Sequence, residues 1–173
     1  TAAFLEDQDF FRYNGLFRDV YLLGRPAGHI QDVRIVTENG GIAISIQGEA
    51  AVRVYDGSSL LGECAFKDSL FFPIEDPVYW NAEQPYLYRV ELERGGEILS
   101  LRVGFRTVGV SSAGELLVNG TAVKLKGVNH HDTSPQNGWC MSYEDIRRDL
   151  LLMKSLNINT VRTAHYPPSP CFL

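Results

Sequence analysis

Two short polar segments, each directly after an apolar run, constrain the fold of this chain more than any other feature. They are Gly-Val-Asn-His-His at residues 127–131 and Val-Arg-Thr-Ala-His-Tyr-Pro at residues 161–167. One amphipathic helical pattern lies between the two apolar runs. A strand, a helix and a second strand in this order form a right-handed unit with parallel strands. We therefore expect both polar segments at the carboxyl ends of neighbouring strands, where parallel β/α folds build active sites.

The region between these segments carries clear helix signals. Ser142 followed by Asp145 predicts a capping box at the start of a helix. Three apolar residues then recur at helical spacing: Ile146, Leu150 and Met153. A closed parallel barrel has eight strands and roughly 250 residues. Residues 110–173 therefore predict the first β/α units of a truncated TIM barrel, and we expect the chain to be a piece of a larger enzyme.

Residues 26–109 have an all-β pattern. Apolar residues alternate with polar ones over several short runs, at 33–37, 42–46, 52–54, 70–72, 88–92 and 98–103. Roughly seven short strands in about 85 residues predict an immunoglobulin-like β-sandwich. The chain as a whole is therefore predicted to be mainly β. Beyond the sandwich, Asn119-Gly120 between two apolar runs predicts a hairpin whose second arm continues to Val128.

Residues 1–25 are acidic and aromatic at first and then strand-forming, from Leu16 to Leu23. This run is too short to fold alone, so we expect the last strand of an earlier domain or an edge strand here. The cluster Glu6-Asp7-Gln8-Asp9 is either a solvated turn or a source of one carboxylate for a sugar or cation site.

Composition narrows the class of protein. A hydrophobic fraction of 45% and a charged fraction of 21% are typical of a soluble globular protein. A net charge of -5 without a Lys/Arg run argues against a nucleic-acid partner. No apolar segment approaches ~18 residues, so no membrane span is expected. The amino terminus lacks signal-peptide features, and the 3 cysteines form no CxxC pair. We expect free thiols in a reducing compartment, the cytoplasm.

Two histidines follow the predicted strands. His131 and His165 could reach one ligand and donate to the hydroxyls of a polyhydroxylated substrate; the alternative is that both are structural. His130 completes a possible metal triad, but adjacent strand residues point to opposite faces, which disfavours a shared ion. Arg162 is expected to be buried in a strand and paired with a carboxylate, whether catalytic or structural. Asn129 could orient either substrate or a loop.

Acidic residues near the predicted site are few. Asp132 is the one acid beside His131, whereas Glu144 and Asp145 belong to the helix start, where acids are normal. Glycoside cleavage needs two carboxylates flanking the bond. A complete acid and nucleophile pair is not visible in this chain, so no catalytic residue is assigned to it.

Six stretches occur in one order along nearly the whole chain: Phe4–Arg12, Gly15–Val20, Trp80–Tyr88, Val103–Arg106, Leu125–His131 and Arg162–Pro167. As a set they resemble family 2 glycoside hydrolases and, within these, the bacterial β-galactosidases. The resemblance implies the final strand of a sugar-binding jelly roll over residues 1–25. It further implies the immunoglobulin-like domain over 26–109 and the start of the TIM-barrel catalytic domain over 110–173.

The resemblance also implies residue roles. His131 is similar to a histidine that stabilises the transition state, and His165 to one that contacts the galactosyl hydroxyls. Asp9 is similar to an aspartate that binds the galactosyl ring and a sodium ion. Arg162 resembles the arginine that supports the nucleophile, and Asn129 is taken as a supporting residue with it. Magnesium and sodium are implied for the intact enzyme, and no cofactor for the fragment.

The chain departs from the family pattern at two places. His130 stands where β-galactosidases commonly have Arg, and Pro168-Ser169 replaces a more usual Asn-His. The resemblance implies a retaining β-galactosidase that hydrolyses terminal β-D-galactosides such as lactose. Its catalytic glutamates lie on later strands, so we expect this chain alone to be inactive. The remainder of the barrel is its expected partner, and a homo-oligomer is possible.

Two other functions stay open. One is another family 2 activity, such as that of a β-glucuronidase. The other is a non-catalytic module that binds carbohydrate or spaces domains, with aromatics on one sandwich face as candidates: Trp80, Tyr86 and Tyr88. The competing interpretation of these rings is that they pack within the sandwich.

Overall fold

The structure, a computed structural model, describes residues 15–38 and 40–173. It divides into two compact units, which we describe separately. One comprises residues 23–124, and the other joins residues 125–173 to the stretch that ends at residue 22. The three segments expected from the sequence thus map onto two compact units. No helix within the described residues is long and apolar enough to cross a membrane.

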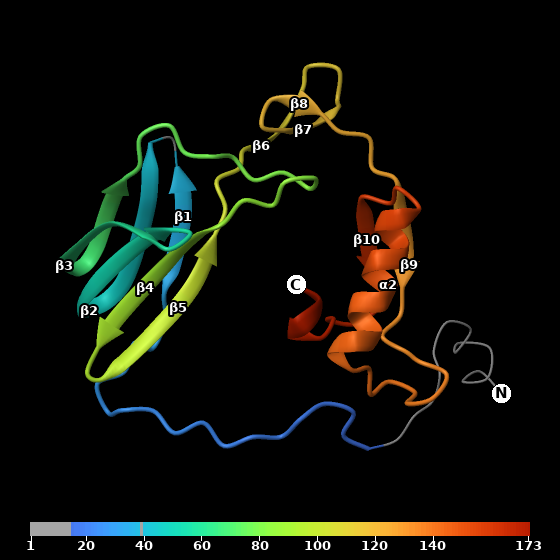
Figure 1. Cartoon of the computed structure of the whole chain (residues 1–173), viewed down its shortest axis with the longest axis horizontal. Coiled ribbons are helices and arrows are strands. Elements are labelled where there is room, and N and C mark those ends of the chain that lie inside the picture. Colours follow the sequence, from blue (N-terminus) through green and yellow to red (C-terminus); the bar gives the residue numbers. More distant parts are fainter. Residues whose placement is uncertain (1–14, 39) are drawn as a thin grey trace. The chain divides into compact units, whose positions relative to one another are not determined.

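The first unit is built on five antiparallel strands (Figure 1). They are β1 (Arg34–Glu38), β2 (Gly41–Asp56), β3 (Ser59–Pro73), β4 (Tyr88–Arg94) and β5 (Glu97–Val103). The order is β1-β2-β4-β5, with β3 also paired to β2. In β2 and β4 buried residues alternate with less buried ones, because one face of each strand packs on the core.

The long strand β2 takes part in two sets of pairings. Residues 41–45 pair with β1 and residues 51–55 with β4, while β3 follows both halves. The register shifts between Ser45 and Glu49. Gly48 lies at this shift with φ +86, a conformation that favours glycine. Residues 46–48 of β2 lie opposite residue 68 of β3, so β2 has two extra residues at this bulge. A bulge bends a strand, and here it separates the half of β2 that pairs with β1 from the half that pairs with β4.

Because β2 continues through the bulge, the sandwich has fewer strands than the sequence predicts. The runs 42–46 and 52–54 belong to one strand, and 59–73 is likewise continuous. The described part of residues 26–109 therefore contains five complete strands and the beginning of β6 (Val108–Val110), and not roughly seven short strands. Apolar residues from both halves of β2 and from its partners form one core. Its fully buried members include Ile42, Ile44, Val52, Val54, Val90 and Leu92. The immunoglobulin-like sandwich is therefore present, with fewer and longer strands.

An arginine fixes the segment that enters the sandwich. Arg25 Nε donates to Glu97 Oε1 at 2.6 Å, and Arg25 Nη2 donates to Glu97 Oε2 at 2.8 Å. Arg25 Nη2 also donates to the carbonyl oxygen of Ile30 at 2.8 Å, and the Ile30 amide donates to Glu97 Oε2 at 3.1 Å. The bidentate pair places Ile30, which is 1% exposed, in the core.

A small three-stranded sheet completes this unit: β6 (Val108–Val110), β7 (Leu116–Val118) and β8 (Thr121–Ala122). Asn119 and Gly120, with φ of 51 and 75, form the predicted two-residue turn. The second arm ends at Ala122. The expectation that it runs on to Val128 is wrong, because β9 is a separate strand in the other unit.

The second unit contains the predicted strand–helix–strand arrangement. Strands β9 (Gly127–His130) and β10 (Thr160–Thr163) are parallel, and α2 (Tyr143–Ser155) connects them (Figure 1). Ser142 and Asp145 form the predicted capping box, with the Asp145 amide donating to Ser142 Oγ at 3.2 Å. Ile146, on the predicted apolar face, is 2% exposed. A short 3-10 helix, η1 (Pro170–Phe172), follows β10.

The strand predicted over residues 16–23 does not form. Residues 15–33 contain no strand, and Leu16, Val20 and Leu22 are exposed. Strand propensity takes effect only where a neighbouring strand pairs with the segment and buries one face. The composition of this run was therefore insufficient to predict its structure.

Candidate functional site

The candidate site lies at the carboxyl ends of β9 and β10. Thr163 is paired with His130, and the amide of Ala164 donates to the carbonyl oxygen of His130 at 3.0 Å. This register places the next residues of the two segments, His131 and His165, next to each other. Their ring centroids are 5.6 Å apart with an interplanar angle of 77°. The structure thus brings together the two histidines that the sequence predicts at one site.

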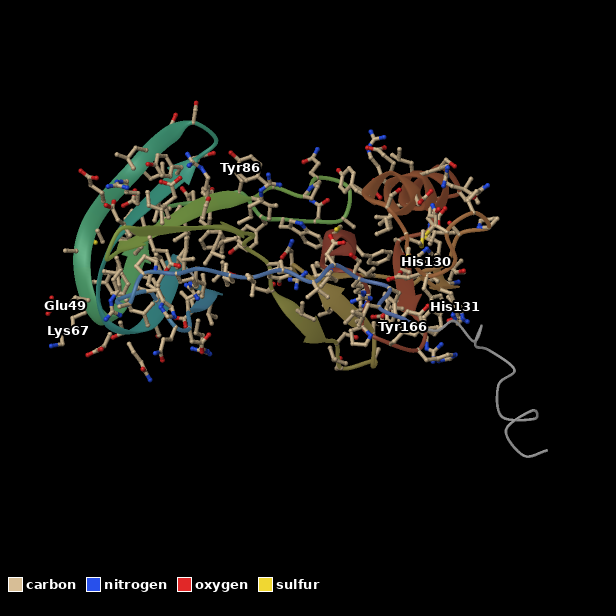
Figure 2. The ribbon with its side chains drawn as sticks, turned by 90° about the horizontal axis from the view of Figure 1, so that it is seen from below. Glu49, Lys67, Tyr86, His130, His131 and Tyr166 are labelled. Carbon is tan, nitrogen blue, oxygen red and sulfur yellow. The ribbon has the colours of Figure 1, made fainter. Side chains whose placement is uncertain are left out.

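The neighbouring histidines of the first segment face opposite sides of the strand pair. His130 is buried, and its Nε2 lies 3.1 Å from Asp149 Oδ2 on α2. His131 instead contacts His165 and Tyr166. Figure 2 shows His130 on the helix side, whereas His131 lies with Tyr166 on the other. The two imidazoles therefore share no ion, and the described residues contain no group of three His, Cys, Asp or Glu that could hold a metal.

Arg162 differs from its expected environment. It is exposed and not buried. Among residues 15–38 and 40–173, its side chain contacts a ring and an amide and not a carboxylate. Arg162 Nη2 lies 3.2 Å from His165 Nδ1, and Nη1 donates to Asn129 Oδ1 at 3.4 Å. The expectation that Arg162 is buried is wrong, because Arg162 lies on an exposed position of β10. The expected carboxylate partner is not among the described residues, and the acids at positions 6, 7 and 9 lie outside them. Arg162 nevertheless contacts both His165 and Asn129, so Asn129 is connected to His165 through the guanidinium, as a supporting residue would be.

The contact with Arg162 fixes the tautomer of neutral His165. A guanidinium has donors and no acceptor, so His165 Nδ1 accepts the hydrogen bond from Arg162. The hydrogen of the neutral ring then resides on Nε2. This places an N–H donor on the ring edge away from Arg162.

Asp132 directs its carboxylate into the protein. It is 6% exposed, and its Oδ2 accepts from the Ser169 amide at 3.0 Å and lies 3.5 Å from Arg18 Nη2. Its Oδ1 lies 3.5 Å from His130 Nδ1. The acid that follows His131 in sequence thus connects three segments of the unit.

A row of aromatic rings continues from the histidines. Tyr166 lies between His131, at 6.3 Å, and Trp139, at 5.6 Å, and Trp139 packs edge-on against Phe17 at 5.2 Å. Burial raises the pKa of the Tyr166 phenol, so its hydroxyl stays protonated at neutral pH. The row links the polar site to residues 15–22.

Neither Arg18 nor Asp149 is predicted from the sequence as part of this site. Arg18 is separated from Asp132 by more than a hundred positions, and no spacing rule connects them. Asp149 could be found from helical periodicity, because it lies three residues after the buried Ile146. An acid near the buried face of a helix requires a polar partner, and His130 is that partner here.

Comparison with known families settles the classification. Residues 23–106 match the family model described as glycosyl hydrolases family 2. Residues 108–173 match the model of the TIM barrel domain of the same family. The chain belongs to glycoside hydrolase family 2. The predicted fold class, an immunoglobulin-like sandwich followed by the first β/α units of a TIM barrel, is confirmed.

The family 2 chain is similar to longer proteins of known name. It is 39% identical to the β-galactosidase of Actinobacillus pleuropneumoniae over 99% of this chain and 18% of that protein. It is also 39% identical to the β-galactosidase of Arthrobacter sp. (strain B7), over 100% of this chain and 18% of that protein. The chain thus spans about a fifth of the length of these curated relatives.

A solved structure is similar to this chain in fold. The apo structure of β-glucuronidase 3 of Bacteroides uniformis superposes with a TM-score of 0.82 at 27% identity. It covers 95% of this family 2 chain and 24% of the glucuronidase chain.

Of the other predicted residues in the family 2 chain, Asp9 lies outside the described residues, whereas the three aromatic residues of the sandwich can be placed. In the sandwich, Tyr88 is 3% exposed and packs against Phe105, and Tyr86 packs edge-on against Tyr88 and donates to Asp56. Trp80 lies 5.1 Å beneath the Arg106 guanidinium. These contacts favour packing roles for the three aromatic residues.

The acids at the start of α2 have local roles. The hydrogen bond from the Ser142 hydroxyl holds the pKa of the Asp145 carboxyl below its usual range, with help from the Ser142 amide. Glu144 occupies the same first turn. Negative charge there is stabilised by the helix dipole, in agreement with the structural interpretation of both residues.

Proposed function

We propose that the protein containing this chain is a retaining β-galactosidase that hydrolyses terminal β-D-galactosides such as lactose. The observation that carries this proposal is the facing pair of His131 and His165 at the ends of adjacent parallel strands. It occurs in a chain that is 33–39% identical to several β-galactosidases over nearly its whole length. In this proposal the chain supplies part of the sugar-binding surface.

The carboxylates of the described residues support a binding role for this region. Retaining hydrolysis needs an acid/base and a nucleophile about 5–5.5 Å apart. Asp132 directly follows His131, but it is buried and engaged by the Ser169 amide and Arg18. In the family pattern both catalytic glutamates lie on later barrel strands, and we assign the acid and the nucleophile to those strands.

The two histidines would bind hydroxyl groups of the sugar. His165 carries its ring hydrogen on Nε2, because Arg162 occupies Nδ1, and this N–H can donate to a hydroxyl oxygen. His131, 5.6 Å away between ring centroids, can contact a neighbouring hydroxyl. Hydrogen bonds that shorten as the sugar ring flattens stabilise the transition state more than the substrate. Asn129 would act with Arg162 in holding His165.

The metal assignments remain part of this proposal. Asp9 would bind the galactosyl ring and sodium, and it lies outside the described residues. Magnesium has no cluster of ligands among residues 15–38 and 40–173. The described residues do not by themselves form a metal site, so no reaction step here is derived through an ion.

The proposal is tested by comparing residues 1–173 with the full reading frame on a nitrophenyl β-galactoside. We expect turnover by the long form alone. In the long form, His131→Ala and His165→Ala should each lower kcat/KM about 100-fold, the order of a lost transition-state donor. His29→Ala, in the sandwich, is the matched control and should leave kcat/KM unchanged. Turnover by residues 1–173 would contradict the assignment of the glutamates.

A β-glucuronidase is the second candidate, because solved β-glucuronidases at 26–27% identity share the fold of this chain. The same full-length preparation is assayed with nitrophenyl galactoside and nitrophenyl glucuronide at equal concentrations. A kcat/KM at least tenfold higher for the galactoside supports the first proposal. A kcat/KM at least tenfold higher for the glucuronide would identify the protein as a β-glucuronidase instead. If neither is hydrolysed, saturable quenching of tryptophan fluorescence by galactans would favour a binding module.

A further inference from the structure

The stretch that precedes the sandwich in sequence contributes an arginine to the strand-end region. Residues up to 22 belong to the same compact unit as residues 125–173. Arg18 Nη2 donates to the carbonyl oxygen of Pro167 at 2.7 Å, and Nη1 donates to that of Pro168 at 3.2 Å. The same Nη2 lies 3.5 Å from Asp132 Oδ2. One guanidinium therefore spans the end of β9 and the segment after β10.

Asp132 holds the next residue of that segment. Its Oδ2 accepts a hydrogen bond from the Ser169 amide at 3.0 Å. Three consecutive residues, 167–169, are thus fixed by Arg18 and Asp132 together. Proline has no N–H, so the two proline carbonyls are the backbone groups available for bonding, and these are the groups that the forked guanidinium contacts.

Both predicted sugar-binding histidines lie next to these anchor points. His131 directly precedes Asp132, and His165 lies two residues before Pro167. Their facing geometry therefore depends on the segments that Arg18 and Asp132 hold together. A second contact acts on the same segment, because Phe17 packs on Trp139 and Trp139 packs on Tyr166.

The geometry points to Arg18, paired with Asp132, as a positioning residue that fixes His165 against His131 for sugar binding. This inference rests on the proposed function for its kinetic consequence. Arg18 acts through the protein, since the hydrogen bonds and the ion pair described for it go to residues 132, 167 and 168. Its rigid five-donor fork suits several acceptors at once, whereas a lysine ammonium is a point charge on a flexible stem.

The first test uses the full-length enzyme and a nitrophenyl galactoside. Arg18→Ala should lower kcat/KM about 100-fold, the order expected when a reacting group is misplaced by about 1 Å. Arg18→Lys should recover about tenfold of that loss by restoring part of the contacts. Arg25→Ala is the matched control, because Arg25 also makes a bidentate ion pair but fixes the sandwich. It should leave kcat/KM within about threefold of the wild type.

A double-mutant cycle separates positioning from general stability. If Arg18 acts through His165, adding Arg18→Ala to His165→Ala should cost less than about threefold in kcat/KM. Losses that multiply would overturn the proposal, and so would a folded Arg18→Ala enzyme with wild-type kinetics. Should Arg18→Ala not fold, the cycle is run with Arg18→Lys and the same outcomes apply.

A readout that needs no activity keeps this test separate from the test of function. Ser169 is the first residue after the two prolines with an amide hydrogen, and that hydrogen is bonded to Asp132. In full-length Arg18→Ala, the Ser169 amide should exchange at least tenfold faster, because the segment is released. Unchanged exchange would overturn the positioning role. Failure of the wild-type enzyme to cleave galactosides, with faster exchange in the variant, would overturn the proposed function alone.

Discussion

The sandwich and the β/α unit bury different kinds of side chains. The sandwich has one cluster of 14 buried apolar residues, contributed by its strands and the segments beside them. In the β/α unit, the buried apolar residues among those described are Ile146 and Ala164. Buried polar residues accompany them: His130, Asp132 and Ser134.

This difference explains which region can act as a scaffold and which can carry a site. Apolar burial stabilises a fold without specifying polar geometry. Buried polar groups must have partners, so they fix the positions of particular atoms. Asp132 shows the second case, because its carboxylate orients segments from residues 18, 130 and 169. The candidate site therefore lies in the unit with the smaller apolar core.

The two tryptophans allow each unit to be followed separately. Trp80 belongs to the sandwich and Trp139 to the β/α unit, and the chain has 2 tryptophans. Trp139→Phe leaves a reporter of the sandwich, and Trp80→Phe leaves a reporter of the β/α unit. The stability of the sandwich is therefore measured in Trp139→Phe, and that of the β/α unit in Trp80→Phe.

The largest effect is expected from Leu92→Ala in the sandwich. Leu92 is fully buried on β4, and a well-packed core cannot collapse around the cavity. The free energy of unfolding should fall by about 4 kcal/mol, near the upper end for such substitutions. Urea unfolding followed by Trp80 measures it. Ile98→Ala is the control, at a position 57% exposed on β5, and it should change the free energy of unfolding by less than ~0.5 kcal/mol. Equal losses from Leu92→Ala and Ile98→Ala would show that the core of the sandwich is not tightly packed.

A smaller loss is expected from Ile146→Ala on α2. Ile146 is 2% exposed, but a groove lined by Leu150 and Leu151 adjoins it. Neighbouring side chains can partly fill the space, so the loss should be about 2 kcal/mol, near the lower end of the range. Unfolding followed by Trp139 measures it, with the exposed Leu152→Ala as the control. A loss of 4 kcal/mol or more would mean that the two cores are equally well packed.

Ser142→Ala should cost still less. It removes the hydroxyl that accepts from the Asp145 amide at 3.2 Å at the start of α2. Loss of such a cap lowers stability by about 1 kcal/mol. Ser155→Ala, in the last turn of the same helix, is the matched serine control and should stay within ~0.5 kcal/mol. Unfolding of both variants is measured by the fluorescence of Trp139. Similar losses of stability in the two would show that the capping box contributes little.

The smallest effect concerns the ion pair that fixes the entry to the sandwich. The hydrogen bond from Arg25 lowers the pKa of Glu97. A carboxyl with a lowered pKa in the fold contributes stability above its unfolded pKa, and this contribution is lost as the pH falls through the folded pKa. The melting temperature followed by Trp80 should thus fall below about pH 5, and less steeply in Glu97→Gln. Parallel pH profiles for the two proteins would contradict this.

Periodicity and local turn chemistry predicted most of the fold. The capping box at Ser142, the hairpin turn at Asn119-Gly120 and the parallel pairing of β9 with β10 are all local signals, or consequences of chain order, and all three are present. The prediction of a strand at residues 16–23 is wrong, because a strand forms only where a partner strand pairs with it. The predicted number of strands is wrong, because β2 continues through a bulge where the sequence has a run of polar residues.

The sequence predicted those site residues that lie at the ends of the two parallel strands. His131 and His165 meet because parallel register places them side by side. The burial of Arg162 was misjudged, since composition does not reveal which face of a strand is covered. Contacts between distant segments, such as that of Arg18 with Pro167, leave no periodic signal in a single sequence.

The β/α unit is formed by two separate stretches of the chain, and this affects how family 2 enzymes can be recombined. The sandwich is, in topological terms, an insertion between residue 22 and residue 125 of another unit. A single crossover near residue 124 would combine Arg18 from one parent with Asp132 and Pro167 from another. Two crossovers, one at each border of the insertion, would exchange the sandwich and keep that set together. Chimeras of family 2 enzymes should therefore retain function more often when the sandwich is transplanted alone than when everything upstream of the barrel is replaced.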